Sequence, residues 1–340
     1  MKIVNAGYEE IKEKDIFKKI ERIARVCYKS EDKIGQGTDI KMIEKLINRR
    51  HYAMLEHGSL CYRVTRDIYS FVVEMVGERQ GEICNLKDVM PISRIRYSRT
   101  YDEAAEHCAD SYIVSGNLRA WFEFFQWAGE RGVNIKQLYI LWSAFNADTN
   151  GIFNVLDYYQ IVGDDRTGII RVEDYSTLLP EERMIHETIS VLFTCDRGVT
   201  HELVRMRDCS FAQESTRYCN YSNDKFGNEI SVIKPCFFEE GTKEYESWKT
   251  AMMYAEIAYN NLISDGAKPQ EARSTLPTSV KADIVVTANL AEWRHIFELR
   301  ACDATGPAHP QMKEIMVPLF LKKREEYSFA FGDLMMRDEV

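Results

Sequence analysis

The chain has 340 residues, a hydrophobic fraction of 45% and a charged fraction of 29%, which is typical of a globular protein with one large or two modest domains. Its formal net charge of −9 argues against broad nucleic-acid binding, because a surface that follows a phosphate backbone needs excess basic residues. No apolar run approaches the roughly 20 residues of a membrane span, and the acidic, amphipathic start predicts no signal peptide. Nine cysteines without a C-x-x-C pair favour reduced thiols in a cytoplasm over disulfides or a zinc site.

The first third of the chain alternates helix and strand signals. Apolar residues at spacings of four, three and four predict an amphipathic helix over residues 15–28. A second helix is expected over 39–49 and an alternating strand over 60–65. Between them lies a polar junction that contains His51 and His57.

Residues 66–186 carry no dense polar motif and are expected to form an insertion or accessory subdomain with several helices. One of these helices spans 117–129, where a stripe of Leu118, Trp121, Phe122 and Phe125 predicts a core-facing surface rather than a cofactor site. The turn cluster at 163–168 lacks the full calcium-loop pattern, so no metal site is predicted.

After Glu187 the sequence predicts a strand, a helix and a loop in close succession. A β-branched strand is expected over 188–194, followed by Asp196 as an N-cap and a helix over 197–208. On that helix one face is expected to carry His201, Arg205 and Asp208. The polar stretch at 210–218 is predicted to be a loop.

The C-terminal third predicts another helix over 248–262, which ends at Gly266 and Pro269. A strand over 283–288 follows, and Asn289 with Glu292 forms a cap-like start for a helix over 290–300. That helix is expected to face a core with Trp293, Ile296 and Phe297.

Three guanidinium groups, those of Arg205, Arg207 and Arg217, recur within one short stretch. The plain interpretation is that they are exposed and offset by Asp208 and Glu214. The alternative is a clamp for a phosphate or carboxylate, because guanidinium groups bind such anions bidentately at any working pH. Further donors lie between the arginines: Ser210, Gln213, Ser215 and Thr216. This donor-rich stretch suits an anionic ligand such as a nucleotide.

Pro235-Cys236 resembles the Pro-Cys dipeptide around the nucleophile of cysteine-using thymidylate synthases. Here two phenylalanines follow the cysteine and no arginine lies next to it, so Cys236 is expected to be a buried structural thiol. Neither a dinucleotide fingerprint nor a Walker loop is present, so a Rossmann-type site is unsupported.

The arginine stretch as a whole resembles the signature of the flavin-dependent thymidylate synthases. Arg205-Met206-Arg207, seven residues and then Ser215 match that family's Arg-His-Arg, seven residues, Ser, with methionine in place of the middle histidine. The resemblance extends to EARSTLP around Arg273, to Asn289, and to ELRACDATGPAHPQMKEI around Arg300. Upstream segments ARVCY and HYAMLEH are similar to the family's N-terminal part.

This resemblance implies an α+β fold, with an antiparallel sheet flanked by helices and a large helical insertion. The implied division is 1–65 for the N-terminal part of the catalytic core, 66–186 for the insertion, and 187–340 for the rest of the core. The family assembles as a homotetramer whose sites draw residues from several subunits.

The resemblance also implies an activity without a protein nucleophile, in which dUMP becomes dTMP. The cofactor is FAD, the one-carbon donor is methylenetetrahydrofolate and the reductant is NADPH. The protein then supplies positioning and electrostatics. Two alternatives remain open: a related dUMP hydroxymethylase, and a non-catalytic flavin or nucleotide binder. Other partners, whether nucleic acid, membrane or metal, are not expected.

By motif position, the resemblance assigns roles to particular residues. Ser215 and Arg300 would act in catalysis. Substrate binding would use Glu202, Gln213, Ser215, Thr216, Arg217, Arg273 and Arg300. Flavin binding would use His51, Arg205, Met206, Arg207, Asn289 and His295. His295 occupies a position that asparagine often fills, and Met206 could pack against the isoalloxazine edge.

Overall fold

The computed structural model describes residues 1–81, 95–101, 110–133, 135–153, 167–222 and 227–337. They form two compact units. The first comprises Met1–Lys12, Arg22–Ile34 and Ile189–Val340, and the second comprises Glu13–Glu21 and Gly35–Thr188. Residues 35–65, which the sequence grouped with the catalytic core, therefore pack within the second unit. The functional division at residues 65 and 186 stays a prediction.

A four-stranded sheet forms the centre of the first unit. Its order is β2 (Gly7–Glu10), β7 (Thr188–Asp196), β10 (Lys281–Asn289) and β8 (Ser210–Gln213). β2 pairs antiparallel with β7, and β10 pairs antiparallel with β8. Every residue of β10 from Ala282 onward is buried, because this inner strand is covered on both faces. A separate parallel pair joins β1 (Lys2–Val4) to β9 (Ser231–Ile233).

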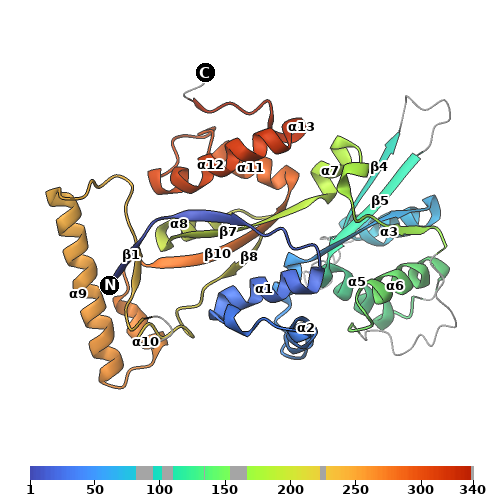
Figure 1. Cartoon of the computed structure of the whole chain (residues 1–340). Helices are drawn as coiled ribbons and strands as arrows, with labels where there is room; N and C mark the ends of the chain where they lie inside the picture. Colours follow the sequence, from blue (N-terminus) through green and yellow to red (C-terminus); the bar gives the residue numbers. More distant parts are fainter. Residues whose placement is uncertain (82–94, 102–109, 134, 154–166, 223–226, 338–340) are drawn as a thin grey trace. The chain divides into compact units, whose positions relative to one another are not determined.

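Helices cover this sheet. α11 (Leu290–Arg300) and α12 (Pro310–Glu326) pack together on one side of β2, β7 and β10, with α13 (Ser328–Phe331) beside them (Figure 1). Their shared core includes Phe297, whose ring lies 5.4 Å from that of Phe320 and 5.2 Å from that of Phe331. The short α8 (Arg197–Leu203) contacts β10. α1 (Ile16–Tyr28) begins among residues of the second unit and ends among those of the first.

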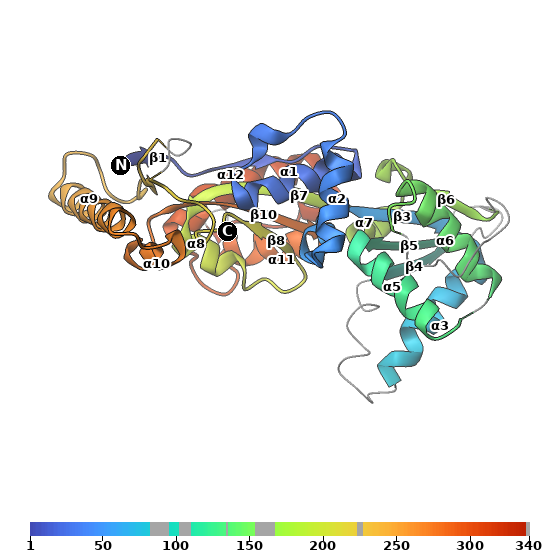
Figure 2. The ribbon, with the colours of Figure 1, turned by 90° about the horizontal axis from the view of Figure 1, so that it is seen from below.

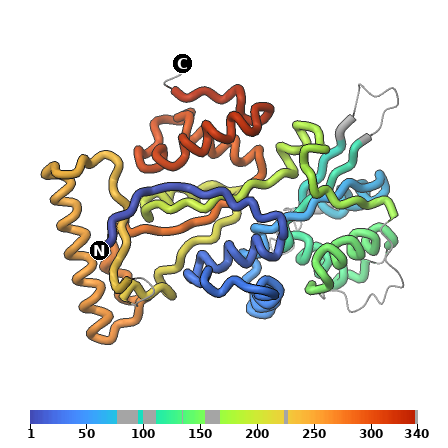
Figure 3. Tube along the Cα trace, in the orientation of Figure 1, coloured from blue at the N-terminus to red at the C-terminus, as the bar shows by residue number. Residues whose placement is uncertain are grey.

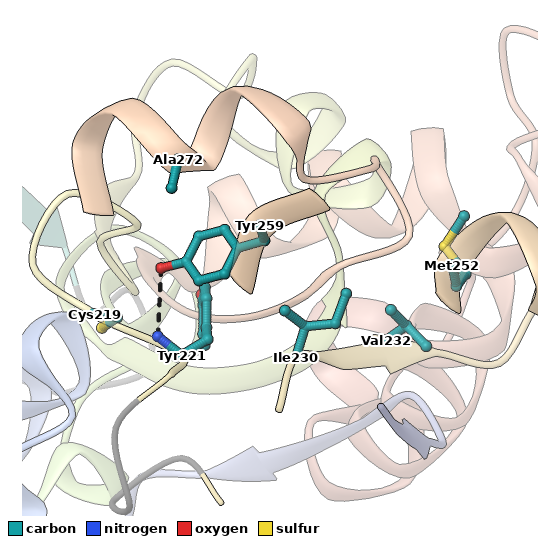
Figure 4. Packing of buried hydrophobic residues seen from close by; sticks show 7 residues of the cluster. All are labelled: Cys219, Tyr221, Ile230, Val232, Met252, Tyr259 and Ala272. Carbon is teal, nitrogen blue, oxygen red and sulfur yellow. Dashed lines mark hydrogen bonds between the residues drawn. The ribbon is translucent and has the colours of Figure 1, made fainter. Parts of the chain in front are cut away.

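A smaller hydrophobic cluster joins β9 to the long helix α9 (Lys243–Ser264) and to α10 (Pro269–Ala272). Figure 3 shows how the chain passes from β9 along α9 and returns through α10. The cluster packs Ile230 and Val232 with Tyr259, and the Tyr221 amide donates to the Tyr259 hydroxyl at 3.4 Å (Figure 4). This packing anchors the residues that follow the arginine stretch.

The second unit is also a sheet with helices. Its strand order is β4 (Arg96–Tyr101), β5 (Asp110–Asn117), β3 (Ser59–Val64) and β6 (Ile169–Arg171), with antiparallel pairing throughout. α5 (Leu118–Glu130) and α6 (Lys136–Asp148) lie side by side on one face (Figure 2). α3 (Arg66–Gly81) contacts α6 and β5, whereas α7 (Pro180–His186) contacts β4 and β5. The unit also contains α2 (Thr38–Asn48) and two 3-10 helices, Tyr52–His57 and Tyr175–Thr177.

The mixed helical and antiparallel architecture confirms the expected α+β class. The predicted helices at 15–28, 39–49, 117–129 and 290–300 are confirmed, as are the strands at 60–65, 188–194 and 283–288. The helix predicted over 248–262 is longer and begins after Thr242, whose hydroxyl accepts from the Tyr245 amide. The turn cluster at 163–168 lies largely outside the described residues, and the insertion stays a prediction. Besides its helices, the segment 66–186 contributes β4, β5 and β6 to the sheet.

Two local predictions around the arginines were wrong. The helix over 197–208 ends at Leu203, so Arg205 and Asp208 share no helical face with His201. The expected loop at 210–218 begins as strand β8, because backbone pairing with β10 overrides its polar composition. A third prediction also fails, because Cys236 is exposed rather than buried.

Candidate active site

The short strand β8 separates the two halves of the arginine motif. Ser210 pairs with Thr287 and Gln213 with Ile284, so the strand spans roughly 10 Å at about 3.4 Å per residue. Arg205 and Arg207 lie before the strand. Gln213 is its last residue, and Glu214 to Arg217 follow it. The motif therefore supplies groups at both ends of one strand.

At the first end, Thr287 pairs with Ser210, and Asn289 lies two residues further along β10, at the end of the sheet where β8 begins. Asn289 is buried and accepts a hydrogen bond from the Glu292 amide at 2.9 Å, which confirms its capping role. The guanidinium groups of Arg205 and Arg207 are exposed and make no ion pair within the described part of the chain. They are available to an anionic ligand.

Met206 differs from its two neighbours because its side chain is only 6% exposed. The chain alternates there, with both arginines outward and the methionine inward. A histidine in this inward position would bury a polar ring, which needs hydrogen-bond partners. Methionine fits the same place as an apolar filler.

At the second end, Gln213 donates through Nε2 to the Thr200 hydroxyl at 3.0 Å. Thr200 in turn donates to the Arg197 carbonyl at 3.0 Å, so the first turn of α8 holds this amide. Thr216 is buried, whereas Arg217 is exposed and lies over the Tyr218 ring at 5.6 Å. A fixed amide, a hydroxyl and an exposed guanidinium thus follow one another along the chain.

Behind this segment lies a charge cluster of Lys29, Lys281, Glu214 and Asp283. Lys281 Nζ contacts Glu214 at 3.0 Å and Asp283 at 2.8 Å, and Lys29 Nζ contacts Glu214 at 3.5 Å and also Asp283. Tyr221 donates to Glu214 at 3.0 Å. Two ammonium groups thus balance the two buried carboxylates, and Lys29 Nζ also lies 3.9 Å from the exposed Glu31.

Burial and charge oppose each other in this cluster. Burial acts to raise the pKa of Asp283, but Lys281 and Lys29 outweigh it and lower that pKa. Burial acts to lower the pKa of Lys29, but Glu214 and Asp283 raise it overall. Burial raises the pKa of Tyr221, and the Glu214 carboxylate raises it further. Asp283 and Lys29 are therefore ionised, and Tyr221 is neutral, across the physiological range.

An ion pair joins α8 to the end of α11. Arg300 Nη1 lies 3.2 Å from Glu202 Oε2. The Nε atom of Arg300 is buried and has no hydrogen-bond partner among the described residues. A buried donor without a partner is costly, so this atom suits a ligand acceptor such as a carbonyl oxygen.

The structure brings Glu202 to Arg300, Gln213 to α8, and Asn289 to the Arg205 end of β8. It does not bring Arg273 into these contacts, because this exposed residue begins the 3-10 helix Arg273–Thr275. His295 is exposed on α11, and His51 is exposed in the second unit. The roles of these three residues stay predictions.

Sequence reasoning missed Lys29, Lys281 and Asp283. The sequence held a signal for two of them, because the charged Lys281 and Asp283 lie at the start of the otherwise apolar strand KADIVVTA. A cavity of about 380 Å³ lies beside them and is lined by Lys29, Glu214, Tyr221 and Lys281 among others. A second cavity of about 640 Å³ lies at Cys236 and Glu314. Neither is lined by a residue that the motif assigned.

No helix among the described residues is long and apolar enough to cross a membrane. In the same part of the chain, no three His, Cys, Asp or Glu side chains group in a way that could hold a metal ion.

Comparison with known proteins points to one family. The model of the family described as "Thymidylate synthase complementing protein" matches residues 182–324. The flavin-dependent thymidylate synthase of Pyrococcus abyssi is 34% identical over 134 residues, which cover 39% of this chain and 53% of that protein. That of Pyrococcus furiosus is 37% identical over 109 residues, covering 32% and 44%. That of Corynebacterium glutamicum is 30% identical over 152 residues, covering 40% and 57%.

The chain thus spans about half the length of the curated relatives it matches. Among solved structures, it is similar to the UMP/dUMP methylase PolB from Streptomyces cacaoi bound with 5-Br dUMP. The sequence identity is 21% and the TM-score 0.34, over 43% of this chain and 71% of that one.

The matched residues contain both ends of β8, the Arg300–Glu202 pair and Asn289. Over residues 182–324 the chain is thus similar to that family, and over part of its length it is similar to proteins named flavin-dependent thymidylate synthases.

Proposed function

We propose that this protein is a flavin-dependent thymidylate synthase that converts dUMP to dTMP, with methylenetetrahydrofolate as one-carbon donor and NADPH as reductant. One observation carries the proposal: β8 places two exposed arginines at one end and a donor-rich segment at the other. The family match over residues 182–324 includes this segment, and relatives that match part of the chain are named flavin-dependent thymidylate synthases.

The second end of β8 is the proposed nucleotide site. Arg217 is exposed and always charged, so it suits the phosphate of dUMP. Ser215 and Thr216 add hydroxyl groups, and Gln213 is held by Thr200 with its second amide hydrogen and its oxygen available for hydrogen bonds. Arg273 is proposed to add a further positive charge.

Arg300 is proposed to polarise the pyrimidine ring. Glu202 holds one Nη atom, which fixes the guanidinium plane, while Nε is buried without a partner among the described residues. A donor fixed in this way stabilises negative charge that develops on a carbonyl oxygen, without reorganisation during the reaction.

The residues at the first end of β8 fit FAD. Arg205 and Arg207 present two exposed guanidinium groups, without ion pairs among the described residues, that suit the anionic pyrophosphate, and Asn289 lies at the same end of the sheet. His295, His51 and the limited exposed surface of Met206 are proposed to complete the contacts. When bound, the flavin supplies the hydride that reduces the transferred carbon to a methyl group.

The family resemblance further leads us to propose a homotetramer in which several copies contribute to each site. One chain holds the proposed flavin residues and the proposed nucleotide residues at opposite ends of β8. Such an assembly would bring the flavin residues of one copy next to the nucleotide residues of another. The molar mass in solution, measured with and without dUMP, tests whether the protein is a tetramer.

The decisive experiment combines an absorption spectrum with a product assay. Purified protein should carry oxidised flavin and, supplied with dUMP, methylenetetrahydrofolate and NADPH under anaerobic conditions, should yield dTMP by mass. Arg300→Lys should lower turnover while leaving flavin content unchanged. Hydroxymethyl-dUMP as the product would replace the proposed reaction with its hydroxymethylase relative. Flavin without any turnover would refute the enzymatic proposal.

A further inference from the structure

Three consecutive residues at the end of α1 contact the proposed nucleotide segment. The Ser215 amide donates to the Cys27 carbonyl at 3.0 Å. The Tyr28 ring lies 5.4 Å from the Tyr218 ring, over which Arg217 lies in turn. Lys29 contacts Glu214 and Asp283. Each residue of Cys27–Lys29 therefore touches a different part of the Glu214–Tyr218 segment.

The backbone of Lys29 is unusual, because its φ is 48°. This left-handed conformation favours glycine or asparagine over lysine. It turns the chain at the end of α1 so that the ammonium group enters the charge cluster. The long side chain, which neither glycine nor asparagine could provide, spans the distance to the two carboxylates.

We propose that Cys27–Lys29 clamps the segment Glu214–Tyr218 in the geometry that binds the nucleotide, and that Lys29 is a positioning residue for this site. The inference rests on the proposed function, since it assigns the clamp a role in binding dUMP. Glu214 is the point of attachment, because it is buried and lies between Gln213 and Ser215 in the chain. On its other side Glu214 is held by Tyr221, which is anchored through Tyr259 (Figure 4).

Removing the ammonium group alone would leave two carboxylates with only Lys281. Lys29→Met could therefore weaken the fold as well as the clamp. The double variant Lys29→Met/Asp283→Asn separates these effects, since it restores one positive charge against one negative charge but does not restore the contact to Glu214. Lys33→Met is a matched control, because Lys33 is exposed a few residues further along.

Hydrogen exchange of the peptide covering residues 213–218 tests the clamp, and calorimetric titration with dUMP tests its role. We expect faster exchange and about tenfold weaker binding, as for the loss of one charge-assisted hydrogen bond, in both variants that lack Lys29. Lys29→Arg should keep most of the affinity, Lys33→Met all of it, and flavin content should not change in any variant.

Unchanged exchange in Lys29→Met would overturn the clamp whatever the protein binds. If the double variant regained both stability and wild-type affinity for dUMP, Lys29 would have only a structural role and the proposal would fail. If the wild-type protein bound no dUMP, the proposed function would fail, and with it the role in nucleotide binding, while the exchange data would still decide whether the segment is clamped.

Discussion

The buried His186 makes the stability of the second unit depend on pH in a way that can be calculated. His186 is the last residue of α7 and is 1% exposed. Its Nδ1 lies 2.7 Å from the Ser115 hydroxyl and its Nε2 lies 2.8 Å from the Ser98 hydroxyl. A neutral imidazole satisfies both contacts, because one ring nitrogen donates and the other accepts.

Burial, together with the positive charge of Arg96, lowers the pKa of His186 from 6.5 to about 3. Between these two values the unfolded chain binds a proton that the folded chain does not. The free energy of unfolding is therefore highest, as far as His186 is concerned, above pH 6.5, and it decreases as the pH falls from 6.5 toward 3. At pH 5 this loss amounts to about 2 kcal/mol, since each pKa unit is worth about 1.4 kcal/mol.

The variant His186→Asn has no titrating ring, so its unfolding free energy should fall by about 2 kcal/mol less than that of the wild type between pH 7.5 and pH 5. Urea titrations at the two pH values, followed by pulsed hydrogen exchange of β5 peptides, measure the difference in the second unit. The control His201→Asn, at an exposed position of α8, should behave like the wild type. Equal pH dependence of His186→Asn and the wild type would refute the reasoning.

Three further predictions concern the first unit. Lys281→Met should lower the free energy of unfolding by about 3–5 kcal/mol, because it removes half the positive charge of a buried cluster; in urea titrations a loss no larger than that of the exposed Lys243→Met would contradict this. Glu202→Gln should weaken dUMP binding about tenfold by releasing its partner guanidinium, and an unchanged calorimetric Kd would count against that role. Asn289→Ala and Asp196→Ala should each cost about 1 kcal/mol of stability as lost helix caps, but only Asn289→Ala should reduce flavin absorbance; equal flavin content in both would remove Asn289 from the flavin site.

Much of the first unit could be predicted because its signals are local. Asn289 and Asp196 were identified as caps, and their side chains accept from Glu292 and Val199 amides three residues on. The helix over 290–300 has the predicted bounds. Helix caps and amphipathic faces depend on residues within about four positions, so a single segment of sequence contains the whole signal.

The ends and partners of β8 could not be predicted in the same way. The stretch 210–218 is mostly polar and resembles a loop, and its first four residues form a strand only because β10 lies beside them. The predicted helix over 197–208 ends early, at Leu203, seven residues before β8 begins. Cys236 was predicted to be buried because of its apolar neighbours, but Phe237 beside it is itself 50% exposed.

The sequence by itself determined the fold class, most of the helices and the set of residues to which the family resemblance assigns roles. Tertiary structure alone decided that the motif lies at two ends of one strand, that Arg300 is held by Glu202, and that Lys29 meets Glu214. These contacts join residues that are far apart along the chain, and such pairs leave no periodic pattern in either segment. Their free energy depends on burial and distance, which arise only when the sheet is assembled.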